Sequence, residues 1–318
     1  MRGSIVCGVD HSEQTGAAVE LARELSARLG LRLVVAHVVT PTAAAGGLVG
    51  TATMHEHDPG PRLDAAKAFL ESLVASERLG DVRIRCELGN AIGLLPLIAD
   101  EEDAQLLVIG SRGRSPLRSA MLGSVSLGVA RSAPCPVAVV PAGARIGRGY
   151  DGFETIVCGV DESAGARQAL RVASCLANAL DAGLILAHAA PVPLVPGASA
   201  AAEGQERLRH AEIERVEELL EQLAADEQIS SSLRVRVAFG AAGGTLADIV
   251  EEEGASLVVV GSRGRGALKA ALLGSVSSEL ASTSRTPVVI VPPNVATAST
   301  RSTGSRREPS GSSHRRAT

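Results

Sequence analysis

Residues 110–126 read GSRGRSPLRSAMLGSVS and directly follow the apolar run Leu106 to Ile109. An apolar run, a glycine-rich stretch and a helix-like segment predict a strand, a loop and a helix in that order. Glycines let the backbone approach a ligand closely, and the free N–H groups at the start of a helix favour an anion. The stretch therefore predicts a phosphate cradle formed by Gly110, Gly113, Gly123 and the segment Ser124-Val125-Ser126.

The same stretch occurs a second time, because residues 261–277 read GSRGRGALKAALLGSVS. The glycine positions, the Ser-Arg pair and the closing Gly-Ser-Val-Ser are all retained. Cys158-Gly-Val-Asp161 likewise repeats Cys7-Gly-Val-Asp10, and both repeats lie 151 positions apart, as 261 − 110 and 158 − 7 show. Solenoid and propeller repeats have periods of about 20 to 50 residues, so this longer period indicates a duplicated domain.

The duplication divides the 318 residues into two domains of ordinary size. We expect the first domain at residues 1–142, a Gly/Arg-rich linker at 143–152 and the second domain at 153–293. Residues 294–318 are rich in Ser and Arg and poor in apolar side chains. Such a tail has little to bury, and we expect it to be disordered.

Strand-like apolar runs alternate with segments of helical periodicity in each half. In the first half we expect the first helix to begin at Glu13 with Ser12 as its cap, and the helix at 91–102 to be interrupted at Pro96. Alternation of this kind requires crossover connections and a parallel sheet. The predicted fold is α/β: two tandem doubly wound, flavodoxin-like (Rossmann-like) domains, each with a five-stranded, mostly parallel sheet in the order 3-2-1-4-5.

Composition and charge exclude several classes of protein. The net charge of −4, the pI near 6.0 and an aromatic content of 1% give no basic surface and few rings for base stacking, so we expect no nucleic-acid partner. No run approaches the roughly 20 apolar residues of a membrane span, and the first residues lack the apolar stretch of a signal peptide. We expect no membrane partner and a cytoplasmic location. Five cysteines without C-x-x-C spacing indicate neither a disulfide framework nor a zinc site.

Asp10 and Asp161 each end the first strand of their half. In an open parallel sheet, ligands bind beyond the carboxyl ends of the strands where the strand order switches, which places Asp10 beside Gly110. A carboxylate there suits a ribose hydroxyl or an adenine amino group better than a phosphate. The alternative is that the glycines only form a tight connection and that Asp10 caps the first helix. The recurrence of every glycine in both halves favours a ligand site.

Signals for catalysis and metal binding are weak. The sequence contains no G-x-x-x-x-G-K-[ST] motif and so lacks a P-loop lysine. No general base is evident beside the glycine stretches, and we assign no catalytic residue. His55-Glu56-His57-Asp58 has metal-binding residue types but lies in a Gly/Pro-rich loop with no equivalent in the second half, so we expect no metal site.

The spacing Gly-x2-Gly-x9-Gly-Ser after a strand, together with an Asp that ends the first strand, resembles the nucleotide-binding signature of the universal stress protein family. The resemblance covers residues 1–293 and fits the tandem, ATP-binding form of that family. It implies ATP as the ligand, with accompanying Mg²⁺ left open, and it implies that Ser126 and Ser277 are further phosphate donors. The residues implied to hold ATP are Val9, Asp10, Val38, Gly110, Gly113, Gly123, Ser124, Val125 and Ser126 in the first half, and Val160, Asp161, Gly261, Gly264, Gly274, Ser275, Val276 and Ser277 in the second.

The resemblance implies a nucleotide-regulated protein of the stress response or of signalling. Two alternatives stay open: a slow ATPase or nucleotide-transferring enzyme that uses the same sites, and a nucleotide-free scaffold that binds a partner. The family pairs its domains through their final strands, which implies an internal pseudo-dimer of the two halves; a homodimer and an unidentified protein partner also stay open. Ala189 is aligned with Val38, so we expect a looser second adenine pocket.

Overall fold

The computed structural model describes eight stretches of the chain. They are residues 3–40, 60–113, 122–141, 143–144, 152–193, 201–229, 233–264 and 273–293, with the side chains of residues 201 and 202 left out. The expectations for the His55–Asp58 segment, for most of the linker and for the tail at 294–318 lie outside these residues.

Each half contains five strands and four helices among the described residues. The strands are β1 (Ser4–Val9), β2 (Arg32–Val39), β3 (Arg83–Leu88), β4 (Ala104–Gly110), β5 (Val137–Val140), β6 (Thr155–Gly159), β7 (Gly183–Ala190), β8 (Leu233–Phe239), β9 (Leu257–Gly261) and β10 (Val288–Val291). The helices are α1 (Thr15–Leu29), α2 (Gly60–Ser76), α3 (Ala91–Glu101), α4 (Ser124–Ser132), α5 (Ala164–Leu180), α6 (Ala201–Asp226), α7 (Ala242–Glu252) and α8 (Ser275–Thr283).

The strand order confirms the predicted fold class. The first half has the order β3-β2-β1-β4-β5 and the second has β8-β7-β6-β9-β10, which is 3-2-1-4-5 in both. Every pairing within a half is parallel. The switch in strand order lies between β1 and β4 and between β6 and β9, where the sequence predicted it.

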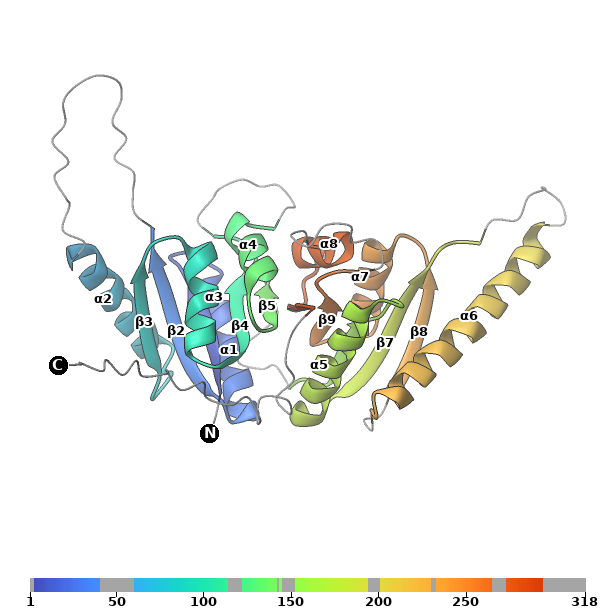
Figure 1. The fold of residues 1–318 in the computed structure, drawn as a ribbon, viewed down its shortest axis with the longest axis horizontal. Coiled ribbons are helices and arrows are strands. Elements are labelled where there is room, and N and C mark those ends of the chain that lie inside the picture. The colour runs from blue at the N-terminus through green and yellow to red at the C-terminus, as the bar shows by residue number, and fades with distance from the viewer. Residues whose placement is uncertain are drawn as a thin grey trace, which may run out of the picture.

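The two halves join through their last strands into one ten-stranded sheet. β5 and β10 pair antiparallel, with Val139 opposite Val288 and Val137 opposite Ile290. Both strands consist of small apolar residues that are fully buried. This confirms the expectation that the final strands pair within one chain, and Figure 1 shows the two halves on either side of that seam.

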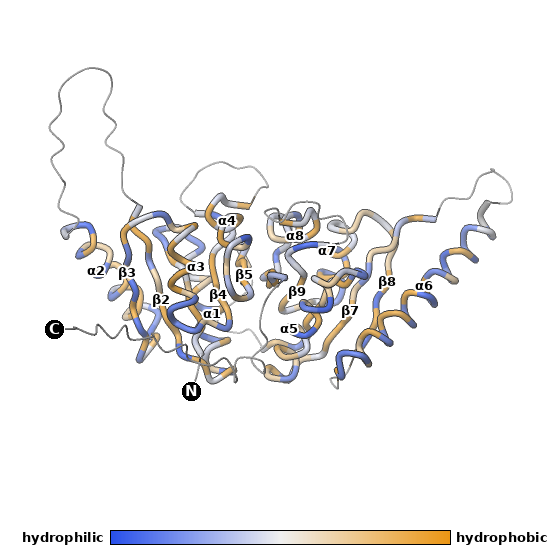
Figure 2. The backbone as a smooth tube through the Cα atoms, viewed as in Figure 1, coloured by the Kyte–Doolittle hydropathy of each residue, from blue (hydrophilic) through white to orange (hydrophobic). Residues whose placement is uncertain are grey.

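Helices cover both faces of the sheet, and each layer continues across the seam. α1, α2, α5 and α6 pack on one face through Leu21, Leu70, Leu170 and Leu220. α3, α4, α7 and α8 pack on the other through Leu95, Val129, Leu246 and Leu280. The inner strands are apolar along most of their length, as Figure 2 shows, because both faces of a parallel sheet are buried. Among the described residues, none of the helices combines the length and the apolar character that crossing a membrane requires.

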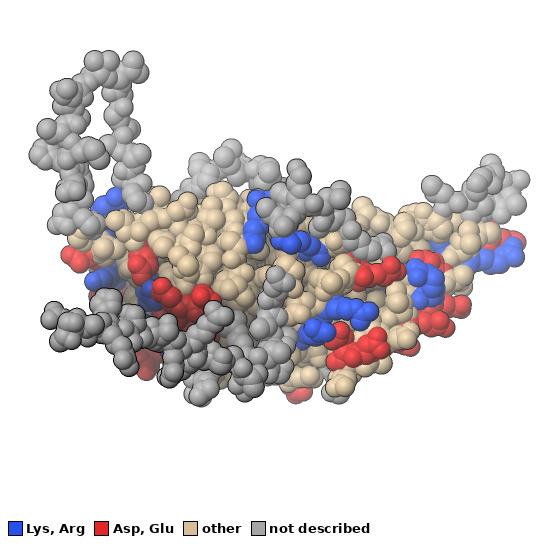
Figure 3. All heavy atoms as spheres, in the orientation of Figure 1, with Lys and Arg blue, Asp and Glu red and all other residues tan. Residues whose placement is uncertain are grey.

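The outer strands β3 and β8 carry the same network of charged side chains. The Glu102 side chain is 2% exposed and accepts hydrogen bonds from Arg85 at 2.8 Å, with Arg83 Nε at 3.2 Å. In the second half, Glu253 pairs with Arg236 in the same way but is 14% exposed. Charged side chains on an edge strand oppose pairing with another sheet. Figure 3 shows that charged side chains on one face gather over the second half, whereas the surface over α3 and α4 is largely uncharged.

Two local expectations are corrected. α1 begins at Thr15 rather than Glu13, its N-cap is Gln14 without a side-chain cap, and the Ser12 hydroxyl donates to Asp10. In the second half the aligned Ser163 donates to Asp161 in the same way and also caps α5, since its Oγ accepts from the N–H of Ala166. The helix α3 also continues through Pro96 without interruption.

Candidate functional site

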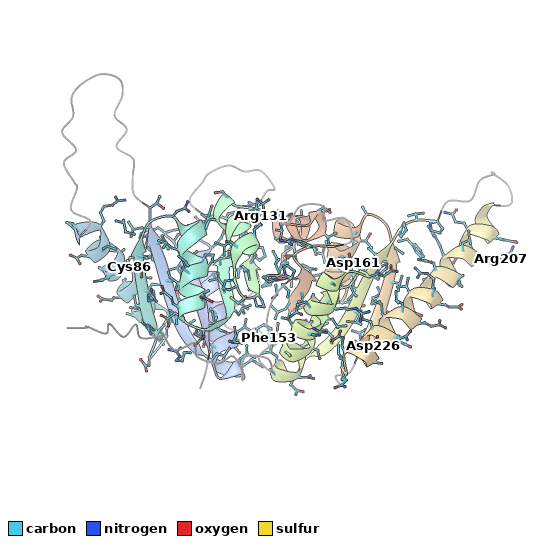
Figure 4. The ribbon with its side chains drawn as sticks, viewed as in Figure 1. Cys86, Arg131, Phe153, Asp161, Arg207 and Asp226 are labelled. Atoms are coloured by element: carbon cyan, nitrogen blue, oxygen red, sulfur yellow. The ribbon has the colours of Figure 1, made fainter. Side chains whose placement is uncertain are left out.

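The carboxyl ends of β1 and β4 lie side by side and bring Asp10 to the glycine stretch. A Cβ atom built on Gly113 would lie 2.9 Å from Asp10 Oδ2, which measures how closely the two segments approach. In the second half, a Cβ on Gly264 would lie 2.6 Å from Asp161 Oδ2. Figure 4 labels Asp161 in the second half, just before the start of α5. The structure therefore brings the two separate sequence signals together at the carboxyl end of the sheet in each half.

Backbone hydrogen bonds hold both ends of the glycine stretch. In the first half, Ser111 N–H donates to Val140 O at 2.7 Å, and Gly123 N–H donates to Ser111 O at 2.8 Å. The second half repeats both bonds at 2.8 Å, from Ser262 and Gly274. The start of α4 or α8 is thus fixed beside the end of β4 or β9, although residues 114–121 and 265–272 between them are not described.

The helices α4 and α8 each begin at a glycine without a side-chain cap. Gly123 and Gly274 are the N-caps, and both have extended backbone, with φ of −60° and −62°. The first N–H groups of a helix have no partner within the helix, and the helix dipole favours an anion there. Ser124 and Ser275, the first helical residues, are exposed. Each helix start can therefore bind a phosphate.

All the site glycines except Gly274 lie where a side chain would be crowded, and none has an unusual backbone angle. None of the six glycines proposed for the two sites is among the glycines with positive φ. A Cβ on Gly123 would lie 3.1 Å from Ser111 O, whereas a Cβ on Gly274 would lie 3.4 Å from its nearest neighbour, Ser262 O. The first distance is tight and the second is ordinary contact, so the two cradles differ in how much space remains.

Ser126 and Ser277 are placed differently from the expected phosphate donors. Both side chains are buried, and their hydroxyls donate to Gly110 O at 2.7 Å and to Gly261 O at 2.6 Å. A hydroxyl has one proton to donate, so these side chains fasten the helix to the preceding strand. Their backbone N–H groups are what they can offer to a phosphate.

Gln14 is a residue of the first site that the sequence analysis missed. Its Oε1 atom accepts the N–H of Arg112 at 2.8 Å and lies 3.2 Å from the position of a Cβ on Gly110. The aligned residue is Gly165, whose carbonyl oxygen lies 2.8 Å from the position of a Cβ on Gly261. The Gln14 side chain therefore lies against Gly110 in the first site, whereas the backbone of Gly165 lies against Gly261 in the second. The mismatch of Gln and Gly between the two repeats was the available signal.

The residues expected near a base lie at the ends of β1 and β2. Val9 is buried, and Val38 is partly exposed on the neighbouring strand. His37 Nδ1 lies 2.7 Å from Val9 O, and His188 Nδ1 lies 2.8 Å from Val160 O in the second half. The Asp10 carboxylate accepts the N–H of Ser12 at 3.0 Å, in the loop before α1 begins. These bonds orient both the strand end and the carboxylate.

The cysteines of β1 and β6 belong to the core rather than to the chemistry of the site. Cys7 and Cys158 are fully buried, and burial raises the pKa of Cys7 to about 12 and that of Cys158 as well. A thiol with so high a pKa is a poor nucleophile.

Of the basic residues in the first glycine stretch, Arg112 is described and partly exposed, whereas Arg114 and Arg118 lie outside the described residues.

The start of α4 is connected to the C-terminal end of α8 across the seam. Leu122 N–H, next to Gly123, donates to Ser282 Oγ on α8 at 3.1 Å. The residue of the first half aligned with Ser282 is Arg131, which lies on α4 at the border with the second half (Figure 4). The contact between the halves is therefore not symmetric at this point.

Comparison with protein families and known proteins agrees with this geometry. The sequence profile described as "Universal stress protein family" matches residues 1–141 and again residues 152–292. A universal stress protein of Mycobacterium tuberculosis is 30% identical over 294 residues, which are 90% of this chain and 96% of that protein. One from Mycolicibacterium smegmatis is also 30% identical, over 91% of this chain and 97% of its own.

Solved structures show the same architecture. The crystal structure of a universal stress protein from Archaeoglobus fulgidus is 19% identical and has a TM-score of 0.65, covering 92% of this chain and 98% of its own. A structure from Pseudomonas aeruginosa, titled a putative universal stress protein, has a TM-score of 0.60 at 18% identity, covering 92% and 93%. At such identities the likeness concerns the fold alone.

Proposed function

This chain belongs to the universal stress protein family, and on that premise we propose that each half binds ATP and that occupancy regulates its contacts with a protein partner. The observation that carries the proposal is made in both halves: an uncapped helix start, at Gly123 or Gly274, ends a glycine stretch whose Gly113 or Gly264 approaches the aspartate that follows the first strand. An anion suits the helix start, and hydroxyl or amino donors suit the aspartate. A nucleotide has both groups.

The proposed binding mode divides ATP between two parts of each site. In the first half, the N–H groups of Ser124, Val125 and Ser126 would bind phosphate, with Gly110 and Gly113 leaving room for the ribose. Asp10, Val9 and Val38 would hold the adenosine. The second half would use the corresponding residues Ser275, Val276, Ser277, Gly261, Gly264, Asp161 and Val160. Mg²⁺ would enter bound to the phosphates.

We propose that the nucleotide is held rather than turned over rapidly. Efficient phosphoryl transfer needs positioned cations and an oriented nucleophile, and the glycine stretches lack the lysine of a P-loop. The domains would be residues 1–142 and 153–293, joined by 143–152 and followed by the tail at 294–318. ATP in the crevice would change the surface around the glycine stretches, which a partner in the cytoplasm would sense.

Labelled ATP added to the purified chain tests the proposal. We expect intact ATP to be retained at up to two equivalents and to raise the unfolding temperature, because a ligand that binds only the folded state stabilises it. Turnover that is lost in Asp10→Ala would instead support the slow enzyme. No retention and an unchanged unfolding temperature would contradict nucleotide binding and support a nucleotide-free scaffold.

A further inference from the structure

Three aromatic rings gather beside Asp10 in the first half. His11 lies in the loop after β1, His37 lies near the end of β2, and Phe69 lies on α2. The ring centroids of His11 and Phe69 are 4.0 Å apart with an interplanar angle of 44°. His37 lies 5.4 Å from each of the other two rings. Three segments that are distant in the sequence thus form one ring cluster at the end of the crevice assigned to adenosine.

The ring cluster has a fixed inner side and an open outer side. His37 is buried and is held by its bond to the carbonyl of Val9. Phe69 is half-buried and packs against the core, whereas His11 is exposed. A ring that is backed by packed groups and open on its outer face can stack on a flat base. His11, supported by Phe69, meets that description.

The second half has no such cluster at the aligned positions. The equivalent residues are Glu162, His188 and Leu219, so two of the three rings are replaced; α6 corresponds to α2 at an offset of 150, as the positive φ of Arg78 and Gln228 after the two helices shows. Glu162 lies 3.9 Å from Arg215, and Leu219 is partly exposed, as Phe69 is. Arg215 also donates to Glu212, and this hydrogen bond lowers the pKa of that carboxyl. A charged group therefore occupies the place that the rings occupy in the first half.

We infer that His11 and Phe69 form a base platform, which makes the first half the purine-selective site, while the second half recognises chiefly the phosphates and ribose. The inference rests on the proposed nucleotide binding. Stacking of a base on an aromatic side chain contributes enough to change affinity by a factor of about 5 to 100. The sequence contains one Tyr, three Phe and no Trp. Because aromatic residues are so rare in this chain, a Phe is not expected at this position by chance.

The test compares a nucleotide with its phosphates alone. Gly274→Asp closes the cradle of the second half and serves as the parent protein. In this parent, His11→Gln and Phe69→Leu each remove a ring without adding charge, and Leu is the residue that the second half carries at the aligned position. Calorimetry then gives the affinities for ATP and for inorganic tripolyphosphate. We expect ATP binding to weaken about tenfold and tripolyphosphate binding to change less than twofold.

A matched control and a direct readout complete the test. His210→Gln removes an exposed histidine on α6 and should change neither affinity. Nuclear Overhauser effects between adenine protons and the rings of His11 and Phe69 report the contact without a substitution, which covers the case in which Phe69→Leu unfolds. If the parent binds neither ligand, the proposed function fails, and the platform fails with it. If the parent binds ATP, two results would show that only the platform is wrong. Either His11→Gln weakens the binding of ATP and of tripolyphosphate by the same factor, or it changes neither affinity.

Discussion

Gly274→Asp should make the protein more stable and remove one nucleotide site. Gly274 is the N-cap of α8 and has extended backbone, which any residue can adopt. A Cβ there would lie 3.4 Å from Ser262 O and 3.6 Å from Arg263 Cα and Ser277 Oγ, all ordinary contact distances. The aspartate carboxylate can then accept the free N–H groups at the start of α8, where the proposed phosphate would otherwise bind.

The two expected effects have opposite signs. An aspartate N-cap is better than glycine by a few tenths of a kcal/mol, and a negative charge near a helix N-terminus adds about 0.3–1 kcal/mol. Together they raise the unfolding temperature by about 1–4 °C for a domain of this size. Against the nucleotide, a carboxylate about 4 Å from one phosphate charge opposes binding by roughly 4 kcal/mol at an effective dielectric constant of 20. The affinity of this site should fall by about a thousandfold.

Calorimetry with ATP, together with thermal unfolding with and without ATP, measures both effects. We expect the stoichiometry to fall from two to one while the ligand-free protein melts higher. Gly204→Asp adds the same charge to the first turn of α6, in open space, and should leave ATP binding unchanged. A variant that still binds two equivalents with unchanged affinity would refute the assignment of the helix start as the phosphate site.

Three further outcomes follow from the described contacts. Ser126→Ala should lower the free energy of unfolding by about 1 kcal/mol. It should change the ATP affinity less than threefold, because the hydroxyl proton is donated to the Gly110 carbonyl. A tenfold loss of affinity in calorimetry would contradict this. Arg85→Ala should destabilise the protein by about 2–3 kcal/mol in urea unfolding, because it leaves the buried Glu102 short of a partner. Arg236→Ala, in the more exposed network of Glu253, should cost less than about 1 kcal/mol. Equal losses of stability in the two variants would count against burial as the cause. A thiol reagent at pH 8 should label the exposed Cys175 first, while Cys7, buried and with a pKa of about 12, reacts only on unfolding; early labelling of Cys7 by mass spectrometry would show that β1 opens.

The predicted fold and most of the predicted crevice rest on local patterns. The 151-residue repeat and the alternation of strands and helices give a parallel sheet with helices on both faces in each half, and the strand order came from taking that sheet to be flavodoxin-like. That order brings the end of β1 beside the end of β4, so Asp10 and the glycine stretch had to meet. The start of α1 was misplaced because Ser12 and Ser163 both bond the preceding aspartate, yet only Ser163 also caps its helix, and local sequence does not separate the two cases.

The sequence by itself determined the duplication and the doubly wound fold, because the repeat and the alternation of strands and helices require parallel strands with crossover connections. With a flavodoxin-like strand order, it also predicted that each aspartate lies beside its glycine stretch. The tertiary structure decided that the Ser126 hydroxyl donates to the Gly110 carbonyl. It also decided that the Gln14 side chain lies beside Gly110 whereas the Gly165 backbone lies beside Gly261, and that His11, His37 and Phe69 converge in the first half. These features depend on which of several competing partners lies within hydrogen-bonding or packing distance. Residues as far apart as positions 11 and 69 come that close only when the helices pack on the finished sheet.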